Sequence, residues 1–176
     1  METGIPLHPA IVHLPLGLAI ALPFITAAIY YLIKTDKLDS LAWWIPVVLQ
    51  VVVVIFTFTA MQIGEGDEEK VEKVVAEEYI EEHEEAGKIF LILGIASLLV
   101  LGAGIKSSKF QSVLQAGSIA LLLVSLGGGV YAGKLGGELV YKHGAASAFT
   151  NPDGAGVQPA AEEGKENKEQ EDDDDD

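Results

Sequence analysis

The sequence of 176 residues contains no cysteine and no arginine. Without cysteine, neither a disulfide framework nor a thiolate metal site can form. Without arginine, a carboxylate partner must be paired by lysine, which lacks the planar, forked donor geometry of a guanidinium. The formal net charge of −15 opposes binding to nucleic acid, because that binding depends on neutralising phosphates with positive side chains. We therefore expect no nucleic acid partner.

Long uncharged runs are abundant, and the mean hydropathy of +0.33 is high for a soluble protein. Four runs are each long enough to cross the hydrocarbon core of a membrane as a helix: about residues 12–33, 41–63, 88–105 and 110–131. The second run is rich in valine, but a lone strand in lipid leaves its backbone unpaired, so helix is favoured. Trp43 and Trp44 are expected to anchor this run at the interface, and Gln50 to face another helix. The sequence predicts an all-α integral membrane protein in contact with the lipid bilayer.

Two short polar turns and one long polar connection join the four runs. They predict an up-down-up-down four-helix bundle over residues 1–144. The glycines of residues 64–66 are predicted to end the second helix. An acidic helical extension is then expected before the third span, with an apolar stripe at Val71, Val74, Val75 and Tyr79. Residues 145–176 lose the apolar pattern and end in an acidic low-complexity run, which predicts a disordered tail.

All four histidines fall at the same end of the predicted bundle, because odd spans begin and even spans end at one membrane face. His8 and His13 lie at the start of the first span, His83 at the start of the third, and His143 after the end of the fourth. Neutral imidazole is a common transition-metal ligand, and haem iron accepts it axially. All four are therefore candidate cofactor ligands, with His13 and His83 preferred as the metal-ligating pair. One more turn of the apolar stripe reaches His83, which predicts that this ring faces inward.

Glycines recur at a four-residue spacing in the last span, at Gly129, Gly133 and Gly137. In a membrane, such a face lets a neighbouring helix or a flat cofactor approach the backbone closely. Cofactor carboxylates have three candidate partners at the same end, namely Lys88, Lys134 and Lys142. The alternatives left open are simple helix packing for the glycines and a position at the water line for the histidines.

Three stretches resemble a bacterial membrane family, the domain-of-unknown-function family 2231: HPAIVHLP at residues 8–15, EEHEEAG at 81–87 and GGELVYKHG at 136–144. The resemblance runs from about residue 6 to residue 144. This family is similar to the four-helix cytochromes b, which hold haem between histidines of their helices. The resemblance implies haem b, with His13 and His83 matching the motif histidines best placed to ligate it. The lack of arginine and the acidic tail depart from the family pattern.

The leading hypothesis is a membrane-embedded haem b protein that transfers electrons, alone or as a subunit of a redox complex, with other membrane or redox subunits as partners. One alternative is a cofactor-free assembly subunit. Another is a zinc or copper protein that uses the four histidines. We expect a bacterial inner-membrane location with the histidine face and both termini outside the cytoplasm, because short turns with little acid are usual inside.

Overall fold

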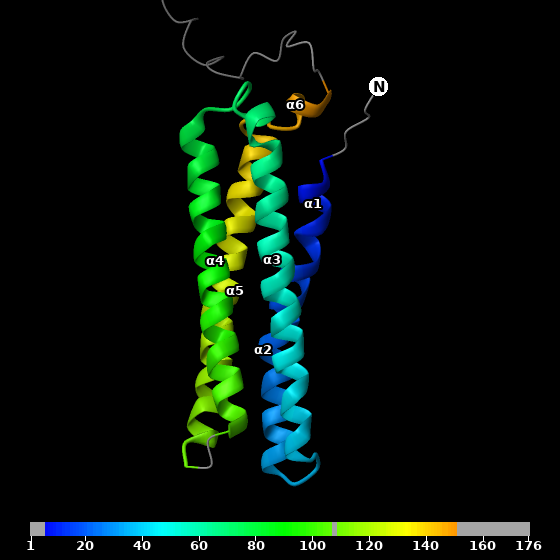
Figure 1. Ribbon diagram of the computed structural model, residues 1–176, viewed down its shortest axis with the longest axis vertical. Helices are drawn as coiled ribbons and strands as arrows, with labels where there is room; N and C mark the ends of the chain where they lie inside the picture. The colour runs from blue at the N-terminus through cyan, green and yellow to red at the C-terminus, as the bar shows by residue number, and fades with distance from the viewer. Residues whose placement is uncertain (1–5, 107–108, 151–176) are drawn as a thin grey trace, which may run out of the picture.

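The computed structural model describes residues 6–106 and 109–150 (Figure 1). Its elements in chain order are α1 (Leu7–Ile11), α2 (His13–Lys34), the 3-10 helix η1 (Ser40–Trp43), α3 (Trp44–Val71), α4 (Glu77–Lys106), α5 (Gln111–Tyr141) and α6 (Ser147–Thr150). These two ranges contain no strand. The all-α prediction is confirmed for them.

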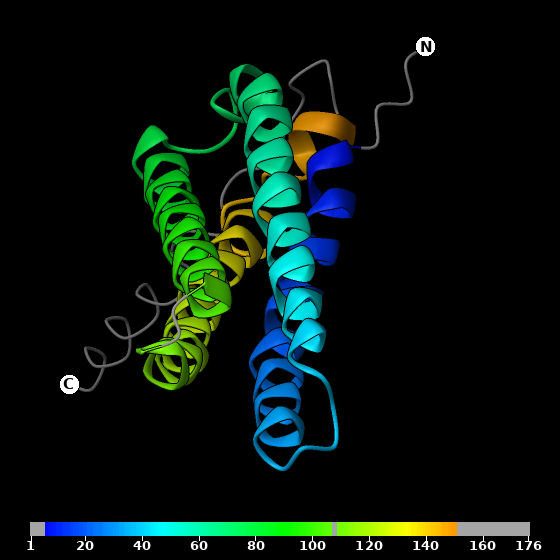
Figure 2. The same ribbon diagram turned by 60° about the horizontal axis from the view of Figure 1, so that its bottom comes forward.

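The four long helices form an antiparallel bundle. The pairs α2–α3 and α4–α5 are two hairpins, and contacts of α3 with α4 and of α2 with α5 join them, as Figures 1 and 2 show. The up-down-up-down prediction is therefore confirmed. Helix α1 packs on α3 and α2, so it lies at the end of the bundle where α3 ends and α4 begins. We refer to this as the histidine end, and to the opposite one as the tight-turn end.

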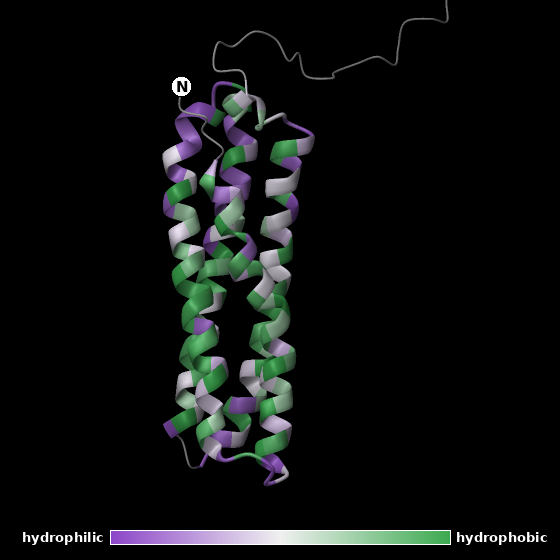
Figure 3. Ribbon diagram, turned by 90° about the vertical axis from the view of Figure 1, so that its right-hand side faces the viewer, coloured by the Kyte–Doolittle hydropathy of each residue, from purple (hydrophilic) through white to green (hydrophobic). Residues whose placement is uncertain are grey.

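Within the described residues, four helical segments are long and apolar enough to cross a membrane: Leu7–Lys34, Ser40–Val71, Glu77–Lys106 and Gln111–Tyr141. Figure 3 shows apolar residues through the middle of the bundle and polar residues gathered towards its ends. Large apolar side chains on the outside, such as Phe24, Leu99 and Val113, are 66%, 69% and 70% exposed. A surface of this kind suits lipid rather than water. The chain is an integral membrane protein.

The predicted helix break at residues 64–66 is wrong. Helix α3 continues through both glycines to Val71, and the helical pattern is interrupted only at residues 72–76. Membrane helices tolerate glycine well, and a small residue is needed at Gly64 because the ring of His8 crosses α3 there. The predicted apolar stripe is partly correct, since Val75 is buried beside Ile80 but Val74 is exposed.

Large side chains fill the tight-turn half of the bundle. Leu22, Trp43 and Leu101 are at most 1% exposed and pack with Ile29, Val47 and Leu122. The indole Nε1–H of Trp43 donates to the carbonyl oxygen of Leu101 at 3.0 Å, because a buried indole N–H needs an acceptor. The expectation that Trp43 lies at the interface is therefore wrong, whereas Trp44 is half exposed.

The chain turns sharply after α5. Gly144 has a φ of +73°, a left-handed conformation that favours glycine. The turn brings Ala145 back onto the bundle, where it is buried beside Leu139 and Val75. Helix α6 follows and contacts α3. Thus the first residues of the predicted tail pack on the bundle, and the rest of that prediction, residues 151–176, lies outside the described residues.

Candidate functional site

Two imidazoles meet at the histidine end. The rings of His8 in α1 and His83 in α4 have centroids 6.1 Å apart and planes at 90°. Both rings are partly buried. The inward orientation predicted for His83 is confirmed, with Ile80 and Ala86 on the same buried face of α4. We call His8 and His83 the imidazole pair.

The ring of His8 is held against α3. Its Nδ1 lies 2.7 Å from the carbonyl oxygen of Ala60. In an α-helix this oxygen already accepts the N–H of residue 64, four positions later, so its second lone pair serves the histidine. A Cβ on Gly64 would lie 3.0 Å from His8 Nδ1. The missing side chain at Gly64 therefore opens the Ala60 carbonyl to the ring.

The ring of His83 is held against α5 in the same way. Its Nδ1 lies 3.1 Å from the carbonyl oxygen of Ala132. A Cβ on Gly136, again four residues after the alanine, would lie 3.0 Å from His83 Cε1. The segment from α1 to α3 thus supplies His8 and the Ala-x-x-x-Gly sequence that receives its ring. The hairpin of α4 and α5 supplies His83 and a second Ala-x-x-x-Gly sequence.

These contacts determine which ring nitrogen carries the proton. A carbonyl oxygen only accepts, so Nδ1 of His8 and of His83 must be the donor. In the neutral imidazole, the lone pair is then on Nε2. Proteins commonly orient a metal-ligating histidine by such a hydrogen bond from its other ring nitrogen. In both members of the pair, Nε2 is therefore the ring nitrogen that can bind a metal.

His13 lies apart from the pair. Its ring is exposed, and its Nδ1 is 2.5 Å from the carbonyl oxygen of Pro9 in the preceding turn. The structure brings His83 together with His8 rather than with His13. The reason is geometric, because Val12 between them keeps helical backbone angles and five residues of a helix separate two side chains by about 140° around the axis.

His143 makes a separate contact. Its ring stacks on Tyr79 with centroids 3.8 Å apart and planes at 21°. The four imidazoles therefore do not form one site. No group of three or more His, Cys, Asp or Glu side chains is arranged to hold a metal ion in residues 6–106 and 109–150.

The glycine ladder is not used as a single face. A Cβ on Gly129 would lie 2.9 Å from Phe90 Cε2, one on Gly133 would only reach Leu16 at 3.5 Å, and one on Gly137 would meet nothing within 4 Å. Each four-residue step turns the helix about 40° beyond a full turn, so the later glycines rotate out of the interface. At Gly129 the glycine serves close packing of α4 on α5.

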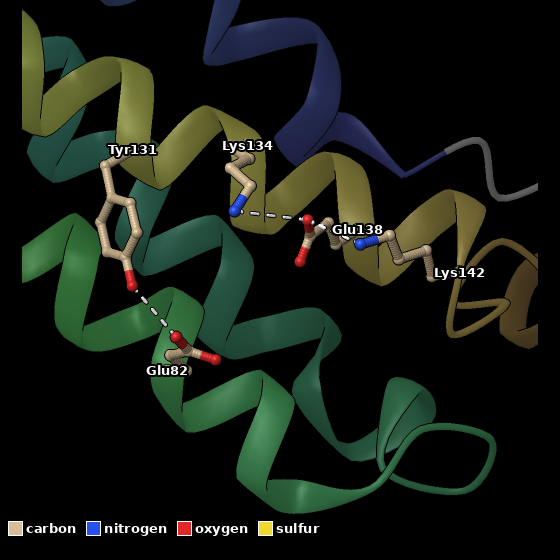
Figure 4. Close-up of polar contacts among 5 residues, drawn as sticks. All are labelled: Glu82, Tyr131, Lys134, Glu138 and Lys142. Carbon is tan, nitrogen blue, oxygen red and sulfur yellow. Dashed lines mark hydrogen bonds and ion pairs between the residues drawn. The ribbon is translucent and has the colours of Figure 1, made fainter.

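The three candidate lysines pair with glutamates of their own helices. Lys88 Nζ lies 3.1 Å from Glu84 in α4. Lys134 and Lys142 both reach Glu138 in α5, at 3.6 and 2.8 Å, and Figure 4 shows Glu138 between them. Beside them, Tyr131 donates its hydroxyl to Glu82 of α4 at 3.0 Å, which joins α5 to α4.

The sequence of residues 4–148 matches the family described as "Predicted membrane protein (DUF2231)". The match covers most of the chain. The chain belongs to the DUF2231 family. Its three motif stretches meet at the imidazole pair, because His8 comes from the first, His83 from the second and Gly136 from the third. No curated protein and no solved structure matched the chain.

Sequence reasoning missed four residues of this site: Ala60, Gly64, Ala132 and Gly136. The available signal is the Ala-x-x-x-Gly spacing, which occurs once in α3 and once in α5 at the same end of this DUF2231 protein. The spacing is easy to overlook because Gly64 has the appearance of a helix breaker and Gly136 lies beside Gly137, the last member of the more regular glycine ladder.

Proposed function

We propose that this DUF2231 protein binds haem b through His8 and His83 and transfers electrons in the membrane, alone or as a redox-complex subunit. The observation that carries the proposal is the facing imidazole pair with centroids 6.1 Å apart. The two rings lie close enough together for both to bind one metal-containing cofactor. The pair replaces His13 and His83 as the favoured ligands.

The residues around the pair fit such ligands in two further respects. First, Gly64 and Gly136 leave space that a Cβ would fill, so the rings can lie directly on the helix backbones. Second, both Nδ1 atoms donate to backbone carbonyls, which orients Nε2 and raises its basicity as a ligand. If haem is bound, His8 and His83 would be the residues that hold its iron, through Nε2.

When bound, haem b supplies one-electron transfer between ferric and ferrous iron. The chain supplies the rest. The carbonyls of Ala60 and Ala132 keep the two imidazoles in one tautomer. His8 belongs to α1 and His83 to α4, so each ligand comes from a different helix. Loss of either ring removes one of the two ligands.

Absorption spectra of the detergent-purified protein, oxidised and reduced, test the proposal. We expect a Soret band that sharpens and shifts on reduction, with about one haem per chain. His83→Ala should remove or shift this spectrum, whereas His143→Ala, which affects a ring outside the pair, should leave it unchanged. A wild-type protein without a Soret band, produced with sufficient iron and haem precursor, contradicts haem binding.

Other outcomes of the same preparation identify the alternatives. Stoichiometric zinc or copper by elemental analysis, without a Soret band, indicates a metal site at the pair. A colourless and metal-free protein that co-purifies with a stoichiometric membrane partner indicates an assembly subunit. The glycine packing at Gly129 does not separate these alternatives, because it stabilises the bundle in each case.

We also propose a bacterial inner-membrane location with the tight-turn end in the cytoplasm. The two turns at that end are short and contain only two acidic residues, Asp36 and Asp39, and short turns with little acid are usual inside. Because the chain has no cysteine, single cysteines at Leu38 and at Ala76 report each end separately. A membrane-impermeant maleimide should label Ala76→Cys and not Leu38→Cys in spheroplasts; the reverse pattern contradicts the orientation.

A further inference from the structure

The lysines at the two ends of the bundle have different surroundings. The ion pairs of the described residues all lie at the histidine end, where each lysine has a carboxylate three or four residues away: Lys70, Lys88, Lys134 and Lys142. The tight-turn end carries four other lysines: Lys34, Lys37, Lys106 and Lys109. None of these four forms an ion pair within residues 6–106 and 109–150.

The two aspartates of the tight-turn end do not neutralise these lysines. Asp39 Oδ1 accepts the backbone N–H of Leu41 at 2.7 Å, so this carboxylate caps η1. Asp36 is exposed in the turn that follows α2. Four lysines against two aspartates leave this end positive, although the formal net charge of the chain is −15. The tight-turn end is thus the positive end of an acidic protein.

Aromatic rings set the depth of these lysines in the membrane. Three ammonium groups lie within 6.0 Å of the centroid of a neighbouring ring: Lys34 at Tyr30, Lys37 at Tyr31 and Lys109 at Phe110. Tyrosine rings favour the level of the lipid headgroups, and Tyr31 is 60% exposed. The ammonium groups beside these rings therefore lie at the level of the lipid phosphates.

A contact between α2 and α5 joins the two turns into one surface. Lys34 Nζ at the end of α2 donates to the hydroxyl oxygen of Ser112 near the start of α5, and this hydroxyl can still donate to another acceptor. At the same end, a shallow apolar groove follows the first two turns of α3, lined by Trp44, Ile45, Val48 and Leu49. Polar donors beside an apolar groove match a phosphate headgroup and its acyl chain.

Stabilisation of helix ends does not account for all four lysines. Lys34 and Lys106 are the last residues of α2 and α4, where a cation interacts favourably with the helix dipole. Lys37 and Lys109 lie outside the helices, so this effect does not explain them. Their charge is matched best by an anion from outside the chain.

We propose that the tight-turn end binds an anionic phospholipid such as phosphatidylglycerol, with an acyl chain along the α3 groove. The lipid phosphate accepts hydrogen bonds from the lysines and from the Ser112 hydroxyl. Lysines beside an anionic membrane surface each add to the attraction, and salt screens it. Phosphatidylcholine has the same phosphate but carries a compensating cation, so it should bind less well. The binding uses neither the imidazole pair nor haem, so it is independent of the proposed function.

Tryptophan fluorescence tests this lipid preference directly. The chain has only two tryptophans, Trp43 and Trp44, and Trp44 is 49% exposed in the groove. The full-length protein is reconstituted in phosphatidylcholine with increasing fractions of acyl-brominated phosphatidylglycerol or acyl-brominated phosphatidylcholine, because bromine quenches a neighbouring indole. Unbrominated lipid of the same headgroup is the reference for each series. We expect half-maximal quenching at a severalfold lower fraction of phosphatidylglycerol, and equal quenching by the two lipids overturns the proposal.

Paired variants locate the preference at one end. The double variant Lys34→Gln with Lys37→Gln should lose most of the difference between the two lipids. Lys70→Gln with Lys73→Gln makes the same change of charge at the histidine end and should keep it; Lys73 also has no ion pair among the described residues. All four lysines are exposed, so these exchanges leave the core intact. Equal losses in the two double variants would show that total charge, rather than this end, attracts the lipid.

A second variant and a competing anion complete the test. Lys106→Gln with Lys109→Gln leaves the contact between Lys34 and Ser112 in place and should also weaken the preference. Inorganic phosphate, added at constant ionic strength, should leave the preference unchanged because it has no acyl chain for the groove. Loss of the preference with inorganic phosphate would assign the lysines to a free anion, and full preference in both tight-turn variants would contradict the site.

Discussion

The two halves of the bundle are packed with different kinds of side chain. The tight-turn half contains a contiguous cluster of large residues around Leu22, Trp43 and Leu101. The histidine half has smaller, separate clusters, and in one of them the small side chains of Ala86 and Ala132 pack with Leu135. Large side chains in the first half provide stability, while small ones in the second leave room for imidazoles to reach backbone carbonyls. The same helices therefore serve stability at one end and a site at the other.

The largest expected effect on stability comes from shortening a buried leucine in the tight-turn half. Leu101 is fully buried, so Leu101→Ala should lower the free energy of unfolding by about 2–5 kcal/mol. Denaturant titration in detergent measures this. Leu99→Ala is the matched control, because that leucine is 69% exposed on the same helix and should cost far less. Equal losses would show that the two positions do not differ in packing.

The next effect concerns the histidine half. Gly136→Ala places a Cβ 3.0 Å from His83 Cε1, so the ring must move; we expect a loss of about 1–3 kcal/mol together with reduced haem occupancy. Gly137→Ala meets nothing within 4 Å and should be neutral or stabilising by up to about 1 kcal/mol, as alanine favours helix. If both variants behave alike, Gly136 has no special role beneath the ring.

A smaller effect is expected at a buried hydrogen bond that joins α3 to α4. Gln50 is 1% exposed and bonds to the Gly94 carbonyl. Hydrogen bonds between membrane helices contribute about 0.6 kcal/mol on average, so Gln50→Leu should destabilise by about that amount. Gln62→Leu, an exposed position on the same helix, provides the baseline. A loss as large as that of Leu101→Ala would mean that this interhelical hydrogen bond stabilises the bundle as much as the apolar cluster does.

The smallest effect is expected at the exposed ion pairs of α5. Glu138 pairs with Lys134 and Lys142, both of which are 64% exposed. Exposed ion pairs contribute little and are screened by salt, so Glu138→Gln should leave the melting temperature and the haem spectrum unchanged at any salt concentration. A salt-dependent change in the spectrum would instead connect these lysines to the cofactor.

Much of the fold was predictable from sequence because hydropathy and loop length suffice for it. The four spans, their topology and the inward side of α4 at His83 all follow from apolar patterning. Two local predictions failed for a common reason. Glycine at Gly64 and tryptophan at Trp43 were assigned their usual roles of helix breaker and interfacial anchor, but tertiary packing used Gly64 to admit a ring and buried Trp43 against a carbonyl.

The site was only partly predictable. Sequence position places all four histidines at one end, but it does not say which rings meet. His8 and His13 are five residues apart, which on a helix separates their directions by about 140°, and only His8 contacts the ring of His83. The decisive contacts are with backbone carbonyls at Ala60 and Ala132, and such acceptors have no signature of their own in a sequence.

The most direct test of the central claim is the haem-to-protein ratio of two variants, His8→Ala and His13→Ala, measured after identical purification. These residues belong to one motif, yet only His8 faces His83. We predict that His13→Ala retains the wild-type ratio and that His8→Ala loses most of its haem. The opposite result, haem retained without His8 and lost without His13, would contradict the assignment of the imidazole pair as the site.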